Sequence, residues 1–404
     1  MLRDARFRLL LAGETINSIG GWASAIVLWG FAAYRFGASP QQVSLTIVCW
    51  AAPPALLSPL AGVLVDRLGP ARALIAGYLA AAAAALGMAA AGSLTVLDLA
   101  AAAYGTARAL AGPAAGALPP RVVADDDLLA ANALLGAAAS AGQVAGPLAA
   151  SVALALSGFP AAFVLDAVSY LIGAAVVVPL RLRPVPDRER ADQPGWKHQL
   201  ATGVRLVVAQ SGLRRVLLLS AAVTFTSAAY LVVEPLYARH VLHRPPSQFA
   251  LFEAAAGAGS ILAGLAISRF RARLAGPRLL AASAAGYGLA AALFTGTTLV
   301  PVAYAGAFAW GVTGALFGAV ALTTLQRLAP AHAHGRVMGV SATLQSWVET
   351  VGLPLGGVAL AGLGIRAGAL ALAAVAIAGG VIGLASRRIV GEPSGSPPPA
   401  RPAG

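Results

Sequence analysis

The sequence predicts an all-α integral membrane protein with twelve transmembrane helices arranged as two six-helix halves. Three observations predict this class: an apolar composition, twelve apolar runs of spanning length, and an uneven distribution of basic residues between alternate loops. Apolar residues make up 58% of the 404 residues, charged residues only 11%, and the mean hydropathy is +0.78. Soluble domains of this length contain more charged residues and fewer apolar ones, since their surface must face water. The chain is therefore expected to lie in a lipid bilayer.

The apolar runs are separated by arginine, proline and Gly-Pro turns. A helix needs about 20 residues to cross the hydrocarbon core of a bilayer. The turn signals place the spans at 8–34, 44–65, 73–91, 96–117, 129–156, 160–180, 214–237, 249–268, 277–297, 301–325, 337–361 and 367–386. Alanine is only weakly apolar, so the third and fourth runs give the weakest signal, and ten or eleven spans are the alternative.

The basic residues lie mostly on one side of these spans. With the N-terminus placed in the cytoplasm, 23 of the 28 lysine and arginine residues fall in cytoplasmic segments, Arg108 falls within a span, and only Arg35, Arg239, Arg244 and Arg366 fall outside. Basic residues accumulate on the cytoplasmic side of membrane proteins. Both termini are therefore predicted to be cytoplasmic. Heavy use of alanine, glycine and arginine, with Lys197 as the single lysine, suggests a bacterial protein, which places the chain in the cytoplasmic membrane.

A polar segment divides the chain into two halves. The stretch RLRPVPDRERADQPGWKHQL is charged and contains proline, so residues 181–213 are predicted to form a cytoplasmic linker between helical halves at 1–180 and 214–388. The segment from Gly62 and the segment from Gly264 each combine a helix end, a basic turn and an alanine-rich helix, which indicates a duplicated six-helix unit. The proline- and glycine-rich tail at 389–404 is predicted to be disordered.

Several function classes lack the residues they require. The sequence contains no P-loop, no GxSxG motif and no metal-binding spacing of histidine and cysteine, so neither an enzyme nor a cofactor or metal site is predicted. The net charge of +13 is spread over short loops, which argues against nucleic-acid binding. Cys49 is the only cysteine and lies in an apolar run, so an internal disulfide is excluded.

Ionisable residues inside predicted spans are the candidate functional residues. Each costs at least about 2.5 kcal/mol at a helix centre unless it is paired or faces water. The candidates are Glu14, Arg108, Asp166, Glu234, Glu253 and Glu349. Glu234 and Glu253 fall near the outer surface and are expected to be solvated. Arg108 can pair with only one or two of the other acids, so the remainder favours proton relay or cation binding. The predicted proton-coupling or cavity residues are therefore Glu14, Arg108, Asp166 and Glu349.

Two short motifs stand out beside these residues. Gly142 and Gly146 are four residues apart on one helical face, and Pro147 follows without a backbone donor. Such a face lets helices approach closely, and the glycines of the span at 249–268 are the expected partner; ordinary tight packing is the alternative. Asp66 and Arg67 end the second span, where a carboxylate that caps the next helix is the simplest interpretation.

These motifs resemble those of the major facilitator superfamily, in particular its drug-proton antiporter branch related to macrolide-efflux and enterobactin-type siderophore exporters. The likeness covers nearly the whole chain. The conformational-switch motif between helices 2 and 3, written GxLaDrxGrk, is similar to Gly62, Asp66, Arg67, Gly69 and Arg72, with Pro70 and Ala71 in place of two basic residues.

Two further patterns carry the same resemblance. Arg108 and Gly112 resemble the helix-4 pattern RxxqG, in which Ala111 replaces the glutamine. The helix-5 antiporter motif gxxxGPxxGG is similar to Gly142, Gly146 and Pro147, with Ala150 and Ser151 in place of its last two glycines. That motif is associated with exporters. Relatives often place an acid near Gly21, which is absent here, so proton coupling in the first span would rest on Glu14.

The resemblance implies two six-helix bundles related by a pseudo-twofold axis along the membrane normal, around a midplane cavity that opens to one side at a time. It implies a monomeric secondary transporter that exports a drug, macrolide-like or siderophore-like small molecule in exchange for protons. A facilitator or importer on the same fold and a non-transporting membrane scaffold are the alternatives.

Two residue-level expectations follow from the resemblance. Asp66 should face Arg336 and Val337 when the cytoplasmic side is closed. Glu14 and Arg108 should form the coupling centre, with Asp166 as the competing partner of Arg108.

Overall fold

The computed structural model describes residues 4–180, 196–269, 277–330 and 333–385, and within these ranges the regular structure is entirely helical. Every predicted span corresponds to one long helix. These helices are α1 (Ala5–Arg35), α2 (Pro40–Leu68), α3 (Pro70–Ala89), α4 (Leu94–Gly116), α6 (Leu128–Ser157), α7 (Phe159–Val177), α9 (Ser211–His240), α10 (Pro246–Arg269), α11 (Pro277–Gly296), α12 (Val300–Leu328), α13 (His334–Leu363) and α14 (Ile365–Ala385). The prediction of an all-α membrane fold with twelve helices is confirmed.

The helices differ in how strongly their composition favours a membrane. By length and hydropathy alone, 10 of the described helices could cross a bilayer, and 11 if α2, which is bent between Leu57 and Leu60, counts as one span. The remaining long helix in the described ranges is α4, which carries Asp98 and Arg108. The weak hydropathy predicted for the fourth span therefore has a specific cause in two charged side chains. The third span, α3, is long and apolar enough to cross a bilayer.

Local sequence signals set the helix ends. The hydroxyl of Ser39 caps α2 by accepting from the amide of Gln42, and the Gln42 side chain accepts in return from the Ser39 amide at 2.8 Å. Gly158 joins α6 to α7 at φ 75°, and Gly364 joins α13 to α14 at φ 81°. Glycine adopts this left-handed backbone without steric cost. The same single-glycine turn therefore occurs at equivalent places in the two halves.

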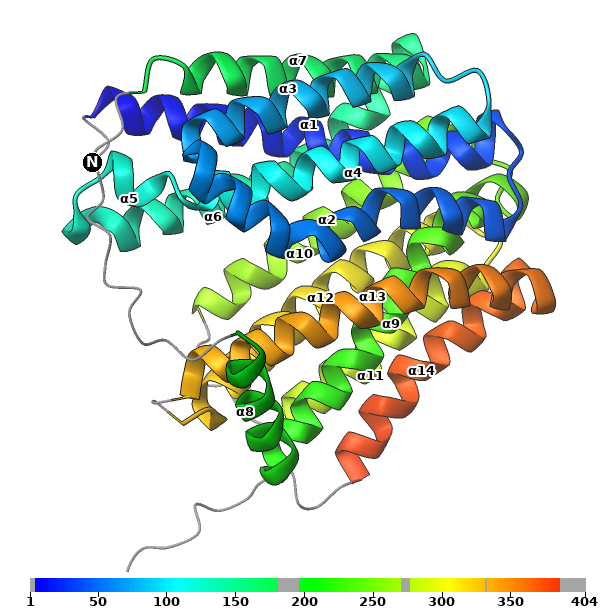
Figure 1. Cartoon of the computed structure of the whole chain (residues 1–404). Helices are drawn as coiled ribbons and strands as arrows, with labels where there is room; N and C mark the ends of the chain where they lie inside the picture. The colour runs from blue at the N-terminus through cyan, green and yellow to red at the C-terminus, as the bar shows by residue number, and fades with distance from the viewer. Residues whose placement is uncertain (1–3, 181–195, 270–276, 331–332, 386–404) are drawn as a thin grey trace, which may run out of the picture.

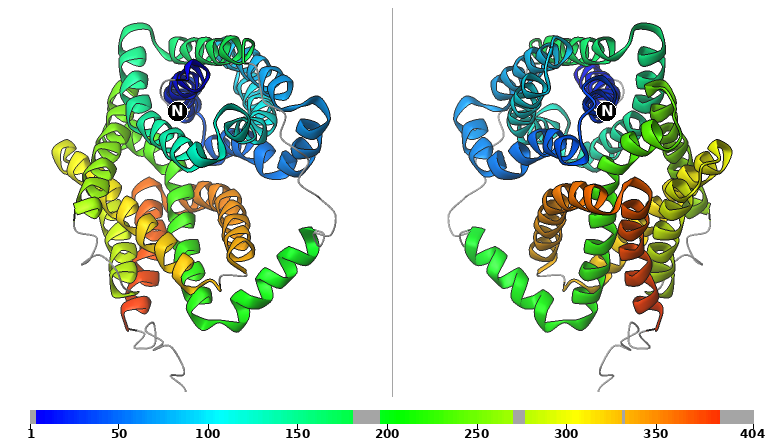
Figure 2. Two further views of the ribbon diagram at one scale, coloured as in Figure 1. Left: turned by 90° about the vertical axis from the view of Figure 1, so that its left-hand side faces the viewer. Right: turned by 90° about the vertical axis from the view of Figure 1, so that its right-hand side faces the viewer.

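The packing of the first six long helices is repeated by the last six. In the N-terminal set, α1 packs on α6 and α7, α4 packs on α2 and α3, and α3 packs on α7. In the C-terminal set, α9 packs on α13 and α14, α12 packs on α10 and α11, and α11 packs on α14. Figure 1 and Figure 2 show these two sets as separate bundles that face each other. The internal sequence similarity therefore corresponds to a repeated packing pattern.

The two bundles contact each other mainly through α6 against α10 and α2 against α13. These contacts gather toward one end of the molecule. A Cβ atom at Gly357 of α13 would lie 2.9 Å from the carbonyl oxygen of Pro40, and Ser151 of α6 donates to the Ser247 carbonyl at 3.0 Å. At the opposite end, which carries the start of α1, the bundles diverge (Figure 1). The structure is therefore closed at the end where α2 begins and open at the end where it finishes.

Shorter helices lie at the open end. α5 (Pro119–Val122) and η1 (Asp125–Asp127) occupy the turn between α4 and α6, and α8 (Trp196–Ala209) precedes α9. α8 falls within the predicted linker, and its Gly203 rests against Val340 and the backbone of Arg336 on α13. The predicted linker thus contains a helix docked on the C-terminal bundle. The first part of the predicted linker, 181–195, and the predicted tail at 389–404 lie outside the described residues.

The orientation in the membrane remains a prediction that a reporter can test. The start of α1, the helix α8 and the end of α14 all lie at the open end (Figure 1), and the basic asymmetry assigns this end to the cytoplasm. Alkaline phosphatase fused after Arg190 or at the C-terminus should therefore be inactive, whereas green fluorescent protein at the same sites should fluoresce. Phosphatase activity at either site would contradict this orientation.

Candidate functional site

Two cavities of about 690 Å³ each lie inside the molecule. The first, the inter-bundle cavity, is lined by α1 and α6 of one bundle and by α9 to α13 of the other. The second, the N-terminal cavity, is lined by helices of the N-terminal bundle alone. Trp22 of α1 lines both, so the two cavities meet at this side chain.

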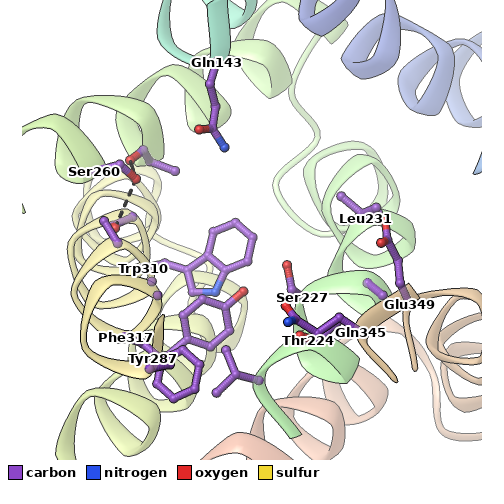
Figure 3. A pocket seen from close by; sticks show the side chains of 18 of the residues that line it. Gln143, Thr224, Ser227, Leu231, Ser260, Tyr287, Trp310, Phe317, Gln345 and Glu349 are labelled. Atoms are coloured by element: carbon purple, nitrogen blue, oxygen red, sulfur yellow. Dashed lines mark hydrogen bonds between the residues drawn. The ribbon is translucent and has the colours of Figure 1, made fainter. Parts of the chain in front are cut away.

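The inter-bundle cavity combines aromatic and polar side chains. Figure 3 shows Gln143 of α6 pointing into it, opposite Tyr287 and Trp310, whose rings lie 5.4 Å apart. Ser227 and Glu349 approach from the other side (Figure 3). This lining offers apolar contact area together with a few hydrogen-bonding groups, which is the usual make-up of a small-molecule site.

Glu14, one of the predicted proton-coupling or cavity residues, lines the N-terminal cavity. Its carboxylate accepts a hydrogen bond from the hydroxyl of Tyr78 on α3 at 2.5 Å. The side chain of Glu14 is half-buried, whereas Tyr78 is buried. Tyr78 thus holds Glu14 from the bundle interior while the cavity leaves the carboxylate accessible to water.

Asp166 is fully buried on α7 and does not line either cavity. Its carboxylate accepts from the hydroxyl of Tyr104 at 2.7 Å and interacts with the hydroxyl of Ser24. Tyr104 and Tyr170 have their hydroxyl oxygens 3.2 Å apart, and the Tyr170 ring lies 5.4 Å from that of Tyr78. A tyrosine cluster, Tyr78, Tyr104 and Tyr170, therefore lies between the two predicted acids.

Arg108 lines the N-terminal cavity but forms no ion pair with Glu14 or Asp166 in the described residues. Its guanidinium lies over the ring of Trp50 on α2, 4.4 Å from the centroid, in a cation–π contact. Asp166 and Glu349 both lie within the electrostatic reach of this charge. The structure therefore gives Arg108 the position of a shared positive charge rather than a partner of one acid.

Glu349 lies on α13 and is exposed to the inter-bundle cavity. Figure 3 places it beside Gln345 and Leu231. Glu14 and Glu349 thus present carboxyl groups from opposite bundles to cavities that meet at Trp22. Three of the four predicted residues thus line these two cavities, Glu14 and Arg108 the N-terminal cavity and Glu349 the inter-bundle cavity.

The expectation of a solvated position near the outer surface is wrong for Glu234, and Glu253 faces the inter-bundle cavity instead of the outer surface. Glu234 is only 1% exposed, enclosed by α9 and its neighbours. Glu253 is half-buried and lines the inter-bundle cavity. The predicted spans end at 237 and begin at 249, which places both residues near a span end. In the structure α9 runs to His240 and α10 begins at Pro246, so each residue lies more than a helical turn inside its helix.

The expected packing of Gly142 and Gly146 against the span at 249–268 is also wrong. Gly142 abuts Ser18 of α1, and a Cβ atom at Gly146 would lie 2.5 Å from Trp22 Cβ. α6 does contact α10, but through a different face, where Val144 meets Gly257. Pro147 lines the inter-bundle cavity. The glycine face therefore closes the N-terminal bundle on α1, while a neighbouring face meets the other bundle.

The conformational-switch motif lies at the open end. α3 begins after Gly69, which has φ 82° and no side-chain cap, so Asp66 does not act as the N-cap of α3. Asp66, Arg67 and Arg72 are exposed, and nothing would obstruct a Cβ atom at Gly62. In this open arrangement the end of α2 lies apart from the start of α13 (Figure 1). The expected contact of Asp66 with Arg336 and Val337 belongs to a closed state and stays a prediction.

Sequence reasoning missed the tyrosine cluster and Asp98. Asp98 accepts from the hydroxyl of Thr46 on α2 at 2.6 Å. A tyrosine inside an apolar span usually needs a partner for its hydroxyl, and this signal could have pointed to Tyr78, Tyr104 and Tyr170. Among the residues that the structure describes, no three histidine, cysteine or acidic side chains are placed to hold a metal ion.

Two pseudo-symmetric helix bundles around a shared cavity define a membrane transport protein. The sequence model described as the Major Facilitator Superfamily matches residues 10–348. The chain therefore belongs to the major facilitator superfamily. A stretch of 58 residues is 40% identical to the "Uncharacterized MFS-type transporter YfiS" of Bacillus subtilis (strain 168), and this match covers 14% of the chain and 14% of that relative.

Solved structures share the fold at low sequence identity. A peptide transporter POT in complex with sulfate aligns with a TM-score of 0.72 at 16% identity, covering 94% of each chain. The nucleoside transporter NupG aligns at 0.71 and 13%, covering 94% of this chain and 99% of that one. A bacterial homolog of the human lysosomal transporter Spinster, in an inward-facing and unoccupied conformation, aligns at 0.69 and 15%, covering 94% and 95%. These likenesses establish the fold.

Proposed function

We propose that the chain exports an amphiphilic small molecule across a bacterial cytoplasmic membrane in exchange for protons. The observation that carries this proposal is the position of Glu14 and Glu349, whose carboxyl groups line cavities that meet at Trp22 between the bundles. A carboxyl group that faces water in one state and is enclosed in another can take up a proton on one side and release it on the other. Arg108 lies within electrostatic reach of Glu349 and would favour the charged form of that carboxyl group once the proton has left.

The direction of transport rests on the open end and on one motif. The bundles diverge at the end that the basic asymmetry assigns to the cytoplasm, so a cytoplasmic compound can enter. Gly142, Gly146 and Pro147 resemble the helix-5 motif of exporters. A drug, macrolide-like or siderophore-like substrate fits the aromatic lining formed by Trp22, Trp29, Tyr287, Trp310 and Phe317. Uptake or facilitated transport is the alternative, since a peptide and a nucleoside transporter share the fold.

Everted membrane vesicles test the proposal directly. Their cytoplasmic face points outward, and respiration acidifies their lumen. Adding ethidium or erythromycin should release protons from the lumen, seen as recovery of a quenched pH-sensitive dye, only in vesicles that contain the chain. Uptake of the compound should stop when the pH gradient is collapsed. Flux that continues without the gradient would indicate a facilitator, and expulsion of preloaded compound together with protons would indicate an importer.

A further inference from the structure

Two carboxyl groups lie side by side in the C-terminal bundle, apart from the acids used above. Glu234 of α9 and Glu253 of α10 are close enough for a hydrogen bond between their side chains. Glu234 is enclosed at 1% exposure, whereas Glu253 lines the inter-bundle cavity. The pair thus has one member in the protein interior and one in contact with the cavity.

Glu234 lacks the donors that a buried carboxylate requires. Among the described residues, no backbone amide, hydroxyl or other permanent donor group donates a hydrogen bond to either of its carboxyl oxygens. Asp166, equally buried in the other bundle, accepts from Tyr104 at 2.7 Å. Burying a charged carboxylate without a donor is costly, and buried polar groups are nearly always satisfied. The adjacent group that can satisfy Glu234 is the carboxyl of Glu253, and a carboxyl donates only when it carries a proton.

Among the residues that the structure describes, none supplies a compensating positive charge to the pair. The titratable side chains facing Glu234 are Tyr230 of α9 and Tyr287 of α11, and Tyr230 already contacts Thr295 at 3.0 Å and donates to the Ala369 carbonyl at 3.1 Å. On α13, Glu349 shares the cavity with Glu253 and is a further acid.

Three described arginines of the C-terminal bundle act on other groups. Arg239 lies over the ring of Tyr34 on α1, Arg366 of α14 acts on Tyr237, and Arg244 acts on Tyr304 of α12. The charge that acts on Glu234 is therefore that of Glu253.

We propose that Glu234 and Glu253 bind one proton between them and exchange it through the inter-bundle cavity. In the loaded form, the hydroxyl of one carboxyl group donates to a carboxylate oxygen of the other, and the pair carries one negative charge. Release of that proton to cavity water leaves two negative charges. Two like charges at this separation in a low-dielectric interior repel strongly, so the loaded form is favoured while the pair stays enclosed.

A metal or sodium ion fits this site less well than a proton. Such ions take several oxygen ligands, about six to eight in the case of calcium. The described residues place no third acidic, histidine or cysteine side chain with the pair. The other backbone carbonyls of the helical segments around the pair are engaged in their own helices, and Pro235 leaves only the Leu231 carbonyl in this part of α9 without its helical donor. A proton needs only the two carboxyl groups.

The helix that carries Glu253 also forms the contact between the bundles. On α10, the Ser247 carbonyl accepts from Ser151 of α6 at 3.0 Å, and a Cβ atom at Gly257 would lie 3.4 Å from the Cα of Val144. Glu253 lies between these two contact points. A change of charge on Glu253 therefore acts where the bundles touch, which lets the loaded state bias the rocking equilibrium. This step rests on the proposed proton-coupled transport.

Infrared difference spectroscopy of the purified protein in lipid detects the pair without a transport substrate. When pH is stepped across the neutral range, the wild type should show a protonated-carboxyl stretching band that appears on acidification and shifts in D₂O. Glu234→Gln and Glu253→Gln should each lose this band, and the double variant should lose no more than either single variant, because one proton is shared. Asp98→Asn removes another half-buried carboxyl of a spanning helix and should keep the band.

Three results would overturn the shared proton. The first is the absence of any pH-dependent carboxyl band when the infrared spectrum of Glu234→Gln is subtracted from that of the wild type. The second is additive losses in the double variant, which would mean two independent carboxyl groups. The third is carboxylate bands that change when sodium chloride replaces choline chloride at constant pH, which would identify sodium as the ligand. If Glu234→Gln does not fold, as judged by size-exclusion chromatography, Glu253→Gln alone decides the presence of the band.

The spectroscopic result and the transport result are independent. A missing band with intact proton-driven export in vesicles would remove the pair and leave the proposed function standing. Conversely, the protein could show a band that titrates and is lost non-additively, while its transport does not depend on the pH gradient. That result would support the shared proton and remove the proposed proton-driven export.

Discussion

Replacing Glu14 with Gln is expected to abolish proton-driven accumulation while leaving downhill exchange. Glu14 is the carboxyl group of the N-terminal cavity, and Gln keeps its size and can still accept from Tyr78, but it cannot carry a titrating proton. With one proton exchanged per molecule, a gradient of one pH unit is worth about 1.4 kcal/mol and supports an accumulation of about tenfold. The variant should reach only equal concentrations on both sides, measured in reconstituted vesicles with the compound identified by the everted-vesicle assay.

Asp98→Asn is the matched control for this variant. Asp98 is also a half-buried carboxyl of the N-terminal bundle, but it accepts from Thr46 and lines neither cavity. It should keep the full accumulation ratio. A Glu14→Gln protein that still concentrates the compound about tenfold would move the coupling to Asp166, Glu349 or an ion other than the proton.

Replacing Gly146 with Leu should abolish transport and destabilise the N-terminal bundle. A Cβ atom there would lie 2.5 Å from Trp22 Cβ and 3.0 Å from the amide nitrogen of Ala23, so α1 and α6 must separate. Overpacking typically costs about 1 to 3 kcal/mol, and backbone obstruction places Leu at the upper end or beyond. The melting temperature of the variant should be lower, as measured with a thiol-reactive dye that reports exposure of Cys49, the only cysteine. Membrane insertion of a fluorescent fusion should remain normal.

Gly136→Leu provides the control on the same helix. Nothing lies within 4 Å of a Cβ atom at Gly136, so the larger side chain meets open space. Its melting temperature and transport rate should match those of the wild type, and Gly146→Ala should fall in between. Normal transport by Gly146→Leu would show that α1 and α6 can separate without loss of function.

The sequence was sufficient to predict the helices because each one is an apolar run with a clear turn at its ends. Ser39, Gly158 and Gly364 are local signals whose effect depends on their own neighbours in the chain. The repeat was visible for the same reason, since the two segments from Gly62 and Gly264 share their pattern of apolar, basic and small residues.

The candidate site was only partly predictable, because its contacts join residues far apart in the chain. Glu14 and Tyr78 are bonded across 64 positions, and nothing near Glu14 in the sequence indicates this donor. The depth of Glu234 depends on how far α9 extends and on what packs around it, which a count from a span end does not provide. The glycine face of α6 was recognised, but the choice between α1 and α10 as its partner is made by helix rotation.

The position of α4 has a consequence for how the protein is made. Its two charged side chains, Asp98 and Arg108, are both satisfied by α2: the first by Thr46 at 2.6 Å and the second by the ring of Trp50 at 4.4 Å. α4 is also the long helix of the described chain whose hydropathy does not qualify it as a span. During synthesis α2 emerges first, so its partners are already in the membrane when α4 leaves the translocon. Insertion of α4 should then depend on α2 as an intramolecular chaperone, and a chain with α2 deleted should leave α4 on the wrong side of the bilayer.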